Sequence, residues 1–359
     1  MVGLRPTPGP SKGSSVYWFE LVASLAMILV SAELFTNGIE WVGSTFGLSE
    51  GAVGSVLAAV GTALPETLLP LVALLVGRSH RDVGIGAILG APFMLTTLAM
   101  FVMAMAVLLP SRRGRRSREL QADGRVMRQD LGSFLVMYTL AVAAGLARVA
   151  WLRWVLAPVL VVAYALYVRR HFREPAGATN DDEGIPEVIP LHFRRWANRA
   201  LASRGEPVPH PSAASSVTQA LVALAGMVAG ARIFVNGVDG VAARFHVPQL
   251  ALALLLAPLA TELPEKFNSV IWVRRRRDTL ALGNLTGAMV FQSCFPVSVG
   301  LLLTPWRLTG EGLVAALVAL GGGAILWLTV RIRGTLNAKL LLLQGGLYAG
   351  YVAYVLTRL

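Results

Sequence analysis

The sequence predicts an all-α polytopic membrane protein of about ten transmembrane helices, arranged as two inverted five-helix repeats. Three observations predict this fold. Apolar residues make up 55% of the 359 residues and charged residues only 14%, a composition typical of proteins that cross the membrane several times. The apolar residues gather into segments long enough to cross a bilayer. Two of these segments, 199 positions apart, carry the same unusual pattern of polar residues.

Ten apolar segments qualify as spans, because a helix needs about 20 residues to cross the hydrocarbon core. They are residues 16–37, 52–76, 83–109, 131–148, 151–169, 214–236, 248–273, 279–303, 312–330 and 338–357. They divide into a first unit, 16–169, and a second unit, 214–359. Residues 1–15, rich in Pro, Gly and Ser, are expected to form a disordered tail. The polar residues 170–213 are expected to link the two units.

The formal net charge of +12 suggests a nucleic-acid partner, but the distribution of the basic residues argues against one. With ten spans, one side of the membrane holds 21 of the 32 Lys and Arg residues and the other side holds 9. The positive-inside rule then places the 170–213 linker in the cytoplasm and both termini outside, in the inner membrane of a cell. The basic runs 112–118 and 274–277 are interpreted as topology signals and contacts to membrane lipid.

An internal repeat relates the two units. When residues 32–66 are laid on residues 231–265 without a gap, 13 of 35 positions are identical. Thr62, Leu64, Pro65 and Glu66 recur in the same frame, as Thr261, Leu263, Pro264 and Glu265. Each unit has five spans, an odd number, so the second unit enters the membrane from the opposite side. Inverted repeats of this kind are typical of transporters that bind substrate near the middle of the membrane.

The repeated motif places oxygen atoms at similar depth in both units. A hydroxyl and a carboxylate stand four residues apart, so they share one helix face. The proline between them has no N–H, so the carbonyl four residues before it is left without its helical partner. The resulting groups are Glu66, Thr62 and the Gly61 carbonyl in the first unit, and Glu265, Thr261 and the Ala260 carbonyl in the second. Such hard oxygen ligands suit Ca²⁺, Na⁺ or Mg²⁺.

Charged side chains inside a span are a functional-site hypothesis, because each costs about 2.5–3.5 kcal/mol to insert. The alternative is that Glu66 and Glu265 pair structurally with buried bases, but only Arg232 and Lys266 lie well inside spans. Glu262 adds a third acid. It precedes Lys266 by four residues, the favourable order for a helical ion pair. We therefore expect a Glu262–Lys266 pair that tunes the charge of the site, with the alternative that Lys266 points to another helix.

These motifs resemble those of the calcium/cation antiporter superfamily, which includes the sodium/calcium exchangers. Residues 61–66 and 260–265 are similar to its Gly-Thr-Ser-Leu-Pro-Glu-like motif, and residues 86–92 and 283–289 are loosely similar to its second motif. The resemblance covers nearly all of the membrane part. It implies that Glu66 and Glu265 are the central cation ligands, that Thr62 and Thr261 add oxygens, and that access alternates by sliding of the first and sixth helices.

The chain also departs from the family pattern. Ala63 and Glu262 stand where the family usually has Ser, and only Asn284 keeps an amide early in the second motif. Gln292 stands where the family often places Asn or Asp. The resemblance therefore implies that Asn284 and Gln292 supply amide oxygens, while several ligands of the family's flanking sodium sites are missing. Both Na⁺ and H⁺ remain open as coupling ions.

The function predicted from the sequence is secondary antiport of Ca²⁺ or a similar cation against Na⁺ or H⁺. No enzymatic activity is expected, and no cofactor beyond the transported cations. The alternative from another class is a sensor or scaffold that keeps the fold without transport. An intramembrane hydrolase is disfavoured, because the five His residues fall in loops or at helix ends and Cys294 is a lone thiol. The sequence predicts no oligomeric state.

Overall fold

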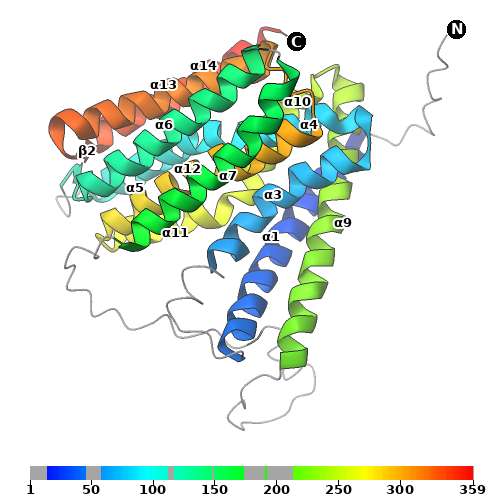
Figure 1. Cartoon of the computed structure of the whole chain (residues 1–359), viewed down its shortest axis with the longest axis horizontal. Coiled ribbons are helices and arrows are strands. Elements are labelled where there is room, and N and C mark those ends of the chain that lie inside the picture. The colour runs from blue at the N-terminus through cyan, green and yellow to red at the C-terminus, as the bar shows by residue number, and fades with distance from the viewer. Residues whose placement is uncertain are drawn as a thin grey trace, which may run out of the picture.

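The computed structural model describes residues 14–45, 58–111, 117–147, 149–173, 191 and 213–358. This part of the chain is almost entirely helical (Figure 1). Eight of its helices are long and apolar enough to cross a membrane, which confirms an all-α polytopic membrane protein. Most of the predicted tail, 1–15, and of the predicted linker, 170–213, lies outside the described residues.

The helices follow one another in chain order, with two very short strands. They are α1 (Ser14–Thr45), α3 (Ala58–Val76), η2 (Arg78–His80), α4 (Arg81–Met94), η3 (Leu95–Ala99), α5 (Met100–Ser111), β1 (Glu119–Leu120), α6 (Gly124–Ala147), α7 (Ala150–Arg173), α9 (Ala213–Phe245), α10 (Gln249–Thr261), α11 (Leu263–Arg274), α12 (Asp278–Leu303), α13 (Gly310–Arg333), β2 (Leu336–Asn337) and α14 (Ala338–Leu356). The spans α4, η3 and α5 form one continuous stretch, Arg81–Leu109, in which η3 is a π-helical turn.

The segment predicted as a single span over 248–273 is divided at Glu262 into α10 and α11. The break is compatible with the position of Pro264, because proline lacks an N–H and is tolerated in the first turn of a helix. Pro264 falls in that first turn of α11. Its counterpart Pro65 lies inside α3, which stays continuous. The same local motif therefore gives one unbroken and one broken helix.

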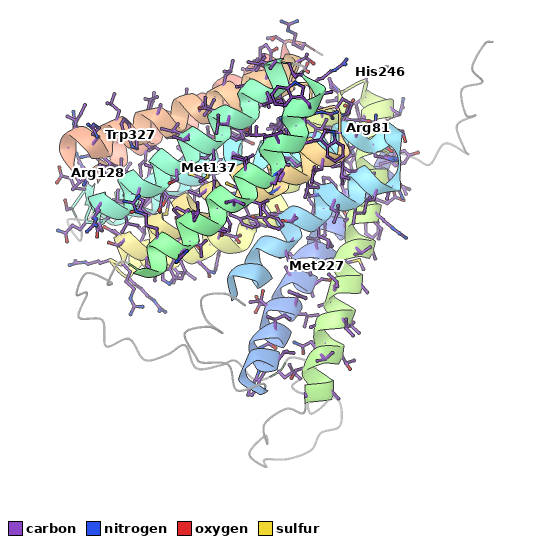
Figure 2. All side chains as sticks on the ribbon, in the orientation of Figure 1. Arg81, Arg128, Met137, Met227, His246 and Trp327 are labelled. Atoms are coloured by element: carbon purple, nitrogen blue, oxygen red, sulfur yellow. The ribbon has the colours of Figure 1, made fainter. Side chains whose placement is uncertain are left out.

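The loops sort to two ends of the bundle. At one end, β1 pairs antiparallel with β2, and Asp278 at the start of α12 accepts a hydrogen bond from the backbone N–H of Gln121 (2.8 Å). At the other end, Nε2 of His80 lies 2.6 Å from Oδ2 of Asp239. Figure 2 shows Arg128 and Trp327 at the first end and Arg81 and His246 at the second. Segments separated by four or six predicted spans thus meet on the same side.

Helices α1 and α9 lie side by side at the edge of the bundle (Figure 1). Their contact is filled by small and apolar side chains, including Ala32, Phe35 and Met227. The pair makes its extensive contacts to the rest of the described bundle through α3 and α10. It therefore borders the helices that carry the repeated motif and few others.

Two glycines let α4 approach α10 closely. A Cβ at Gly86 would lie 2.4 Å from the Leu250 carbonyl oxygen, and a Cβ at Gly90 would lie 2.2 Å from the Leu254 carbonyl oxygen. Such contacts are far shorter than any side chain tolerates, so only glycine fits at either position. The corresponding glycines of α12, Gly283 and Gly287, have no described atom within 4 Å of the equivalent point. The two halves are therefore packed differently at this place.

Candidate functional site

Three carboxylates are buried where α3 meets the α10–α11 break. Glu66 of α3 is 6% exposed, Glu262 at the break is 0% exposed, and Glu265 in the first turn of α11 is 6% exposed. Glu66 lies within electrostatic range of both Glu262 and Glu265. The structure thus brings together the acids of the two repeated motifs, as the sequence predicted. Negative charges this close repel one another strongly in a medium of low dielectric constant.

Several oxygen atoms of this cluster have no hydrogen-bond partner. They are Oε1 of Glu66, Oε1 of Glu262 and Oε2 of Glu265. Both polar atoms of the fully buried Gln292 side chain are also unpartnered, and this side chain lies beside Glu66 and Glu262. A buried polar group without a partner costs about 1–3 kcal/mol. These atoms therefore form a place where a cation or a proton would relieve both the repulsion and the missing contacts.

Lys266 supplies a positive charge inside this cluster. Its Nζ lies 2.9 Å from Oε2 of Glu262, and both side chains are almost fully buried. The same Nζ donates a hydrogen bond to the carbonyl oxygen of Pro258 (3.2 Å). The predicted ion pair is therefore present, and the alternative that Lys266 points to another helix is wrong. The first motif has no such charge, because Thr67 and Ala63 occupy the corresponding positions.

Neutral oxygens surround the acids. The Thr261 hydroxyl donates to the Ala257 carbonyl oxygen (3.3 Å) and keeps its lone pairs for a ligand. The Asn284 amide on α12 donates to the Glu265 carbonyl oxygen (3.2 Å) and to the Ser269 hydroxyl (3.1 Å). Because the amide nitrogen is used in this way, only Oδ1 of Asn284 could bind a cation.

The donor set limits the chemistry that the site can perform. In the described part of the chain, no three Asp, Glu, His or Cys side chains lie close enough together to hold one metal ion. A cation bound here would complete its shell with hydroxyl, amide and carbonyl oxygens, which suits hard cations that exchange readily. The start of α11 adds the positive end of a helix dipole next to Glu262 and Glu265.

Three predicted ligands are described by their helices alone. Gly61 and Thr62 lie in α3 and Ala260 lies in α10, but their side-chain surroundings fall outside the described part of the structure.

The structure also shows polar residues that the sequence did not single out. Ser269 is fully buried one turn after Glu265. The spacing of four residues from Glu265 is the sequence feature from which its place near the site could have been predicted. Asp130 of α6, 1% exposed, accepts hydrogen bonds from Tyr167 (2.8 Å) and Thr286 (2.7 Å). Asp130, Tyr167 and Thr286 come from three different helices, so no regular spacing along the sequence could have predicted their contact.

The chain is similar to known proteins over most of its length. A family model described as sodium/calcium exchanger protein matches residues 16–172 and 215–357. The putative antiporter CaxA of Alkalimonas amylolytica is 24% identical over 286 residues, which are 79% of this chain and 80% of the relative. The inner membrane protein YrbG of Escherichia coli is 22% identical over 297 residues, 79% of each chain.

Two solved structures share the fold. The H⁺/Ca²⁺ exchanger CAX has a TM-score of 0.67 at 16% identity, covering 95% of this chain and 86% of that chain. The sodium-calcium exchanger NCX_Mj has a TM-score of 0.55 at 19% identity, covering 95% of this chain and 99% of that chain. At these identities the likeness describes the fold alone.

Proposed function

Because the chain belongs to the sodium/calcium exchanger protein family, we propose that it is a secondary active cation antiporter of the inner membrane. It exchanges Ca²⁺ or a similar cation for Na⁺ or H⁺ by alternating access. Glu66 and Glu265 carry the cation, Glu262 tunes the charge of the site, and neutral oxygens complete the shell. Those oxygens come from Thr62, Thr261, Asn284, Gln292 and the carbonyls of Gly61 and Ala260.

One observation carries this proposal: buried carboxylates from two distant segments meet with their oxygens unpartnered. Like charges held together in this way are unstable unless a cation or a proton neutralises them. A site that is costly to leave empty favours exchange over one-way release, because the carrier changes orientation more readily when it is loaded. The similar proteins, a putative antiporter and two cation exchangers, support the same class of function.

The proposed architecture has ten spans in two inverted repeats, 16–169 and 214–359. Eight long helices and the two shorter apolar helices Leu64–Val76 and Gln249–Leu259 supply the ten. The connecting segments meet at two opposite ends of the bundle, which supports successive spans that cross the membrane in alternating directions. With the basic end in the cytoplasm, both termini lie outside and the 170–213 linker lies inside.

The coupling ion follows from the neutral ligands. Ala87, Ala91 and Leu95 give α4 and η3 no oxygen-bearing side chain at the positions that match Asn284, Ala288 and Gln292 of α12. Fewer oxygens leave fewer places for Na⁺, whereas a proton needs only a carboxylate. This favours H⁺ as the counter-ion.

The test is ⁴⁵Ca²⁺ uptake into proteoliposomes that hold the purified protein, driven first by a pH gradient and then by a sodium gradient. We expect uptake with the pH gradient that is lost in Glu265→Gln. Glu311→Gln, at the start of α13, is the matched control and should retain uptake. The variants are compared at equal amounts of reconstituted protein.

Uptake under a sodium gradient alone would keep the antiporter and overturn proton coupling. Equal uptake by wild type and Glu265→Gln would overturn the assignment of the site. If Ca²⁺ does not move under either gradient, and Sr²⁺, Mn²⁺ and Mg²⁺ do not move in its place, the antiporter proposal fails and the sensor or scaffold remains.

A further inference from the structure

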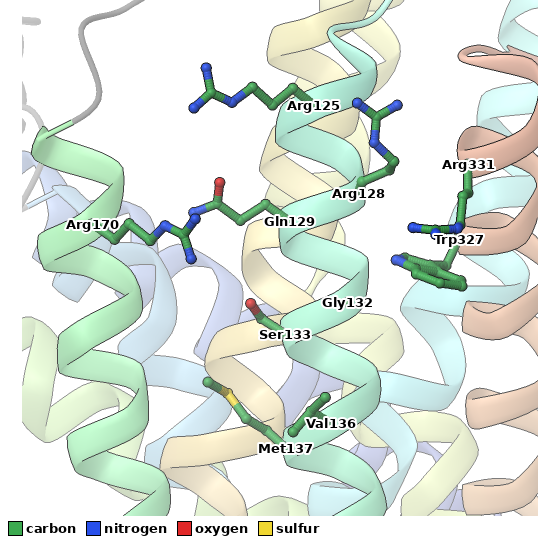
Figure 3. A pocket seen from close by; sticks show the side chains of 10 residues that line it. All are labelled: Arg125, Arg128, Gln129, Gly132, Ser133, Val136, Met137, Arg170, Trp327 and Arg331. Atoms are coloured by element: carbon green, nitrogen blue, oxygen red, sulfur yellow. The ribbon is translucent and has the colours of Figure 1, made fainter.

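A groove lined by arginines lies at the end of the bundle that carries β1 and β2, and none of its lining residues belongs to the carboxylate cluster. It runs over the first half of α6, between the C-terminal parts of α7 and α13, and has a volume of about 540 Å³. Figure 3 shows the side chains that line it. Those used below are Arg125, Arg128, Gln129, Arg170, Trp327 and Arg331. We call it the arginine groove.

The chemistry of this groove selects an anion. Four guanidinium groups from three helices line it, and the described lining includes no acidic side chain. Arg331 is held over the ring of Trp327, with its Cζ 5.3 Å from the ring centroid. Planar guanidinium groups bind phosphate through two parallel hydrogen bonds, which suits them to this ligand better than to a simple halide.

A second observation points to a ligand. Nε2 of Gln129 is buried and has no hydrogen-bond partner in the described structure. In Figure 3 the Gln129 side chain extends from α6 toward Arg170. An amide N–H left without a partner at the floor of a groove of positive charge is a donor for an anionic oxygen.

The surroundings of the groove favour the phosphate of a lipid headgroup over a free phosphate ion. Val136 lines the groove and is 64% exposed, and Leu140 follows it one turn along α6 at 44%. One turn away from Arg170 and Arg331, toward the middle of the span, lie the exposed side chains of Leu166 and Leu328. Positive charge is thus continuous with an apolar surface that faces lipid. Trp327 is a residue type that gathers at the membrane interface.

We propose that the arginine groove is a binding site for the phosphate headgroup of an anionic phospholipid, whose acyl chains lie along Val136, Leu140 and Leu328. Basic pockets between spans on the cytoplasmic side have the geometry that such headgroups need. A free phosphate shares the polar half of this chemistry but gains nothing from the apolar half. The groove shares no residue with the carboxylate cluster, so the proposal stands independently of the transported ion.

The test is native mass spectrometry of the purified full chain, titrated with phosphatidylglycerol, with phosphatidylcholine and with inorganic phosphate. Wild type should bind phosphatidylglycerol at least about fivefold more tightly than phosphatidylcholine. The double variant Arg128→Ala/Arg331→Ala should lose about 25-fold in affinity for phosphatidylglycerol, at about fivefold for each basic residue removed. The double variant Arg333→Ala/Lys339→Ala, at the same end and with the same charge change, should lose little.

An equal loss in both double variants would show that bulk charge, and not the groove, holds the lipid. Displacement of phosphatidylglycerol by an equal concentration of inorganic phosphate would show that a free anion is the ligand. If the Arg128 and Arg331 variant does not fold, a diazirine-bearing phosphatidylglycerol is crosslinked to wild type. The crosslinked peptide should contain residues 124–140 or 324–333, and labelling confined to other peptides would overturn the proposal.

Discussion

The ammonium group of Lys266 lies 2.9 Å from the carboxylate of Glu262, and both are buried beside the acids of the repeated motif. The pair belongs to one motif only, since Thr67 and Ala63 stand at the matching positions of the other. A fixed positive charge in this place reduces the negative charge that a cation meets. It also holds Glu262 in a single arrangement, because the same nitrogen is tied to the Pro258 carbonyl.

Removal of this charge should tighten cation binding. In Lys266→Ala, Glu262 loses its partner and adds a full negative charge to the cluster, so the apparent affinity for Ca²⁺ should rise about tenfold or more. Isothermal titration in detergent would measure the change. Lys266→Arg keeps the charge and should stay close to wild type. If the Ala and Arg variants bind alike, the positive charge of Lys266 has no part in setting the affinity.

Gln292 offers a sharper test of the ligand set. Its amide is fully buried without a partner, so Gln292→Leu removes a desolvated polar group and should leave the ion-free protein as stable as wild type, or more stable. The same change removes an oxygen from the site and should weaken cation binding about tenfold. Thermal unfolding with and without Ca²⁺ separates the two effects. A loss of stability without the ion would instead mean that Gln292 is structural.

The matched glycines should differ in their tolerance of a methyl group. Gly90→Ala would place its Cβ against the Leu254 carbonyl oxygen, whereas the same point at Gly287 is open among the described residues. Overpacking of this kind costs about 1–3 kcal/mol. We expect Gly90→Ala to lower the unfolding temperature and Gly287→Ala to leave it nearly unchanged. Equal effects would contradict the difference in packing between α4 and α12.

The buried Asp130 should be a large contributor to stability. Asp130→Ala removes the acceptor that the hydroxyls of Tyr167 and Thr286 share. Thr286 keeps a second acceptor, the Leu282 carbonyl oxygen (3.0 Å), so the cost should be about 1–3 kcal/mol in all. Tyr167→Phe removes the hydroxyl itself, so one hydrogen bond is lost but no donor on residue 167 is left without an acceptor. This variant should cost about 0.5–1.5 kcal/mol. Chemical denaturation in detergent compares the two variants. A cost for Asp130→Ala no larger than that for Tyr167→Phe would argue against the network.

The acids of the candidate site could be predicted from the sequence, because burial of a charged side chain costs free energy whichever helix supplies its partner. Glu66 and Glu265 could be identified because they are acidic residues within apolar segments. The internal repeat then showed that they occupy equivalent positions in the two units. The Glu262–Lys266 pair was also predictable, since it depends only on spacing within one turn of helix. Local rules of this kind need no knowledge of the neighbouring helices.

Contacts between distant segments could not be predicted in this way. The first span was expected to end at residue 37, but α1 continues to Thr45. Asn37 is buried inside it and accepts a hydrogen bond from Gln219 (2.9 Å), 182 residues away. Asp130 lay just before a predicted span, yet its partners on α7 and α12 bury it. From the sequence alone, a polar residue is assigned to a helix end or a loop, because the distant side chain that forms its hydrogen bond is unknown.

The limited attachment of α1 and α9 has a mechanical consequence. The pair packs along its own length and meets the rest of the described bundle mainly through α3 and α10. The pairing of β1 with β2 joins the segment after α5 to the segment before α14, whereas α9 is joined near its end to η2 by the contact between His80 and Asp239. A displacement of the α1–α9 pair would therefore act first on α3 and α10, which carry Glu66 and Thr261, and little on α12, which carries Asn284 and Gln292. If the proposed site binds a cation, movement of this pair would open or close one side of it while Asn284 and Gln292 on α12 stay in place.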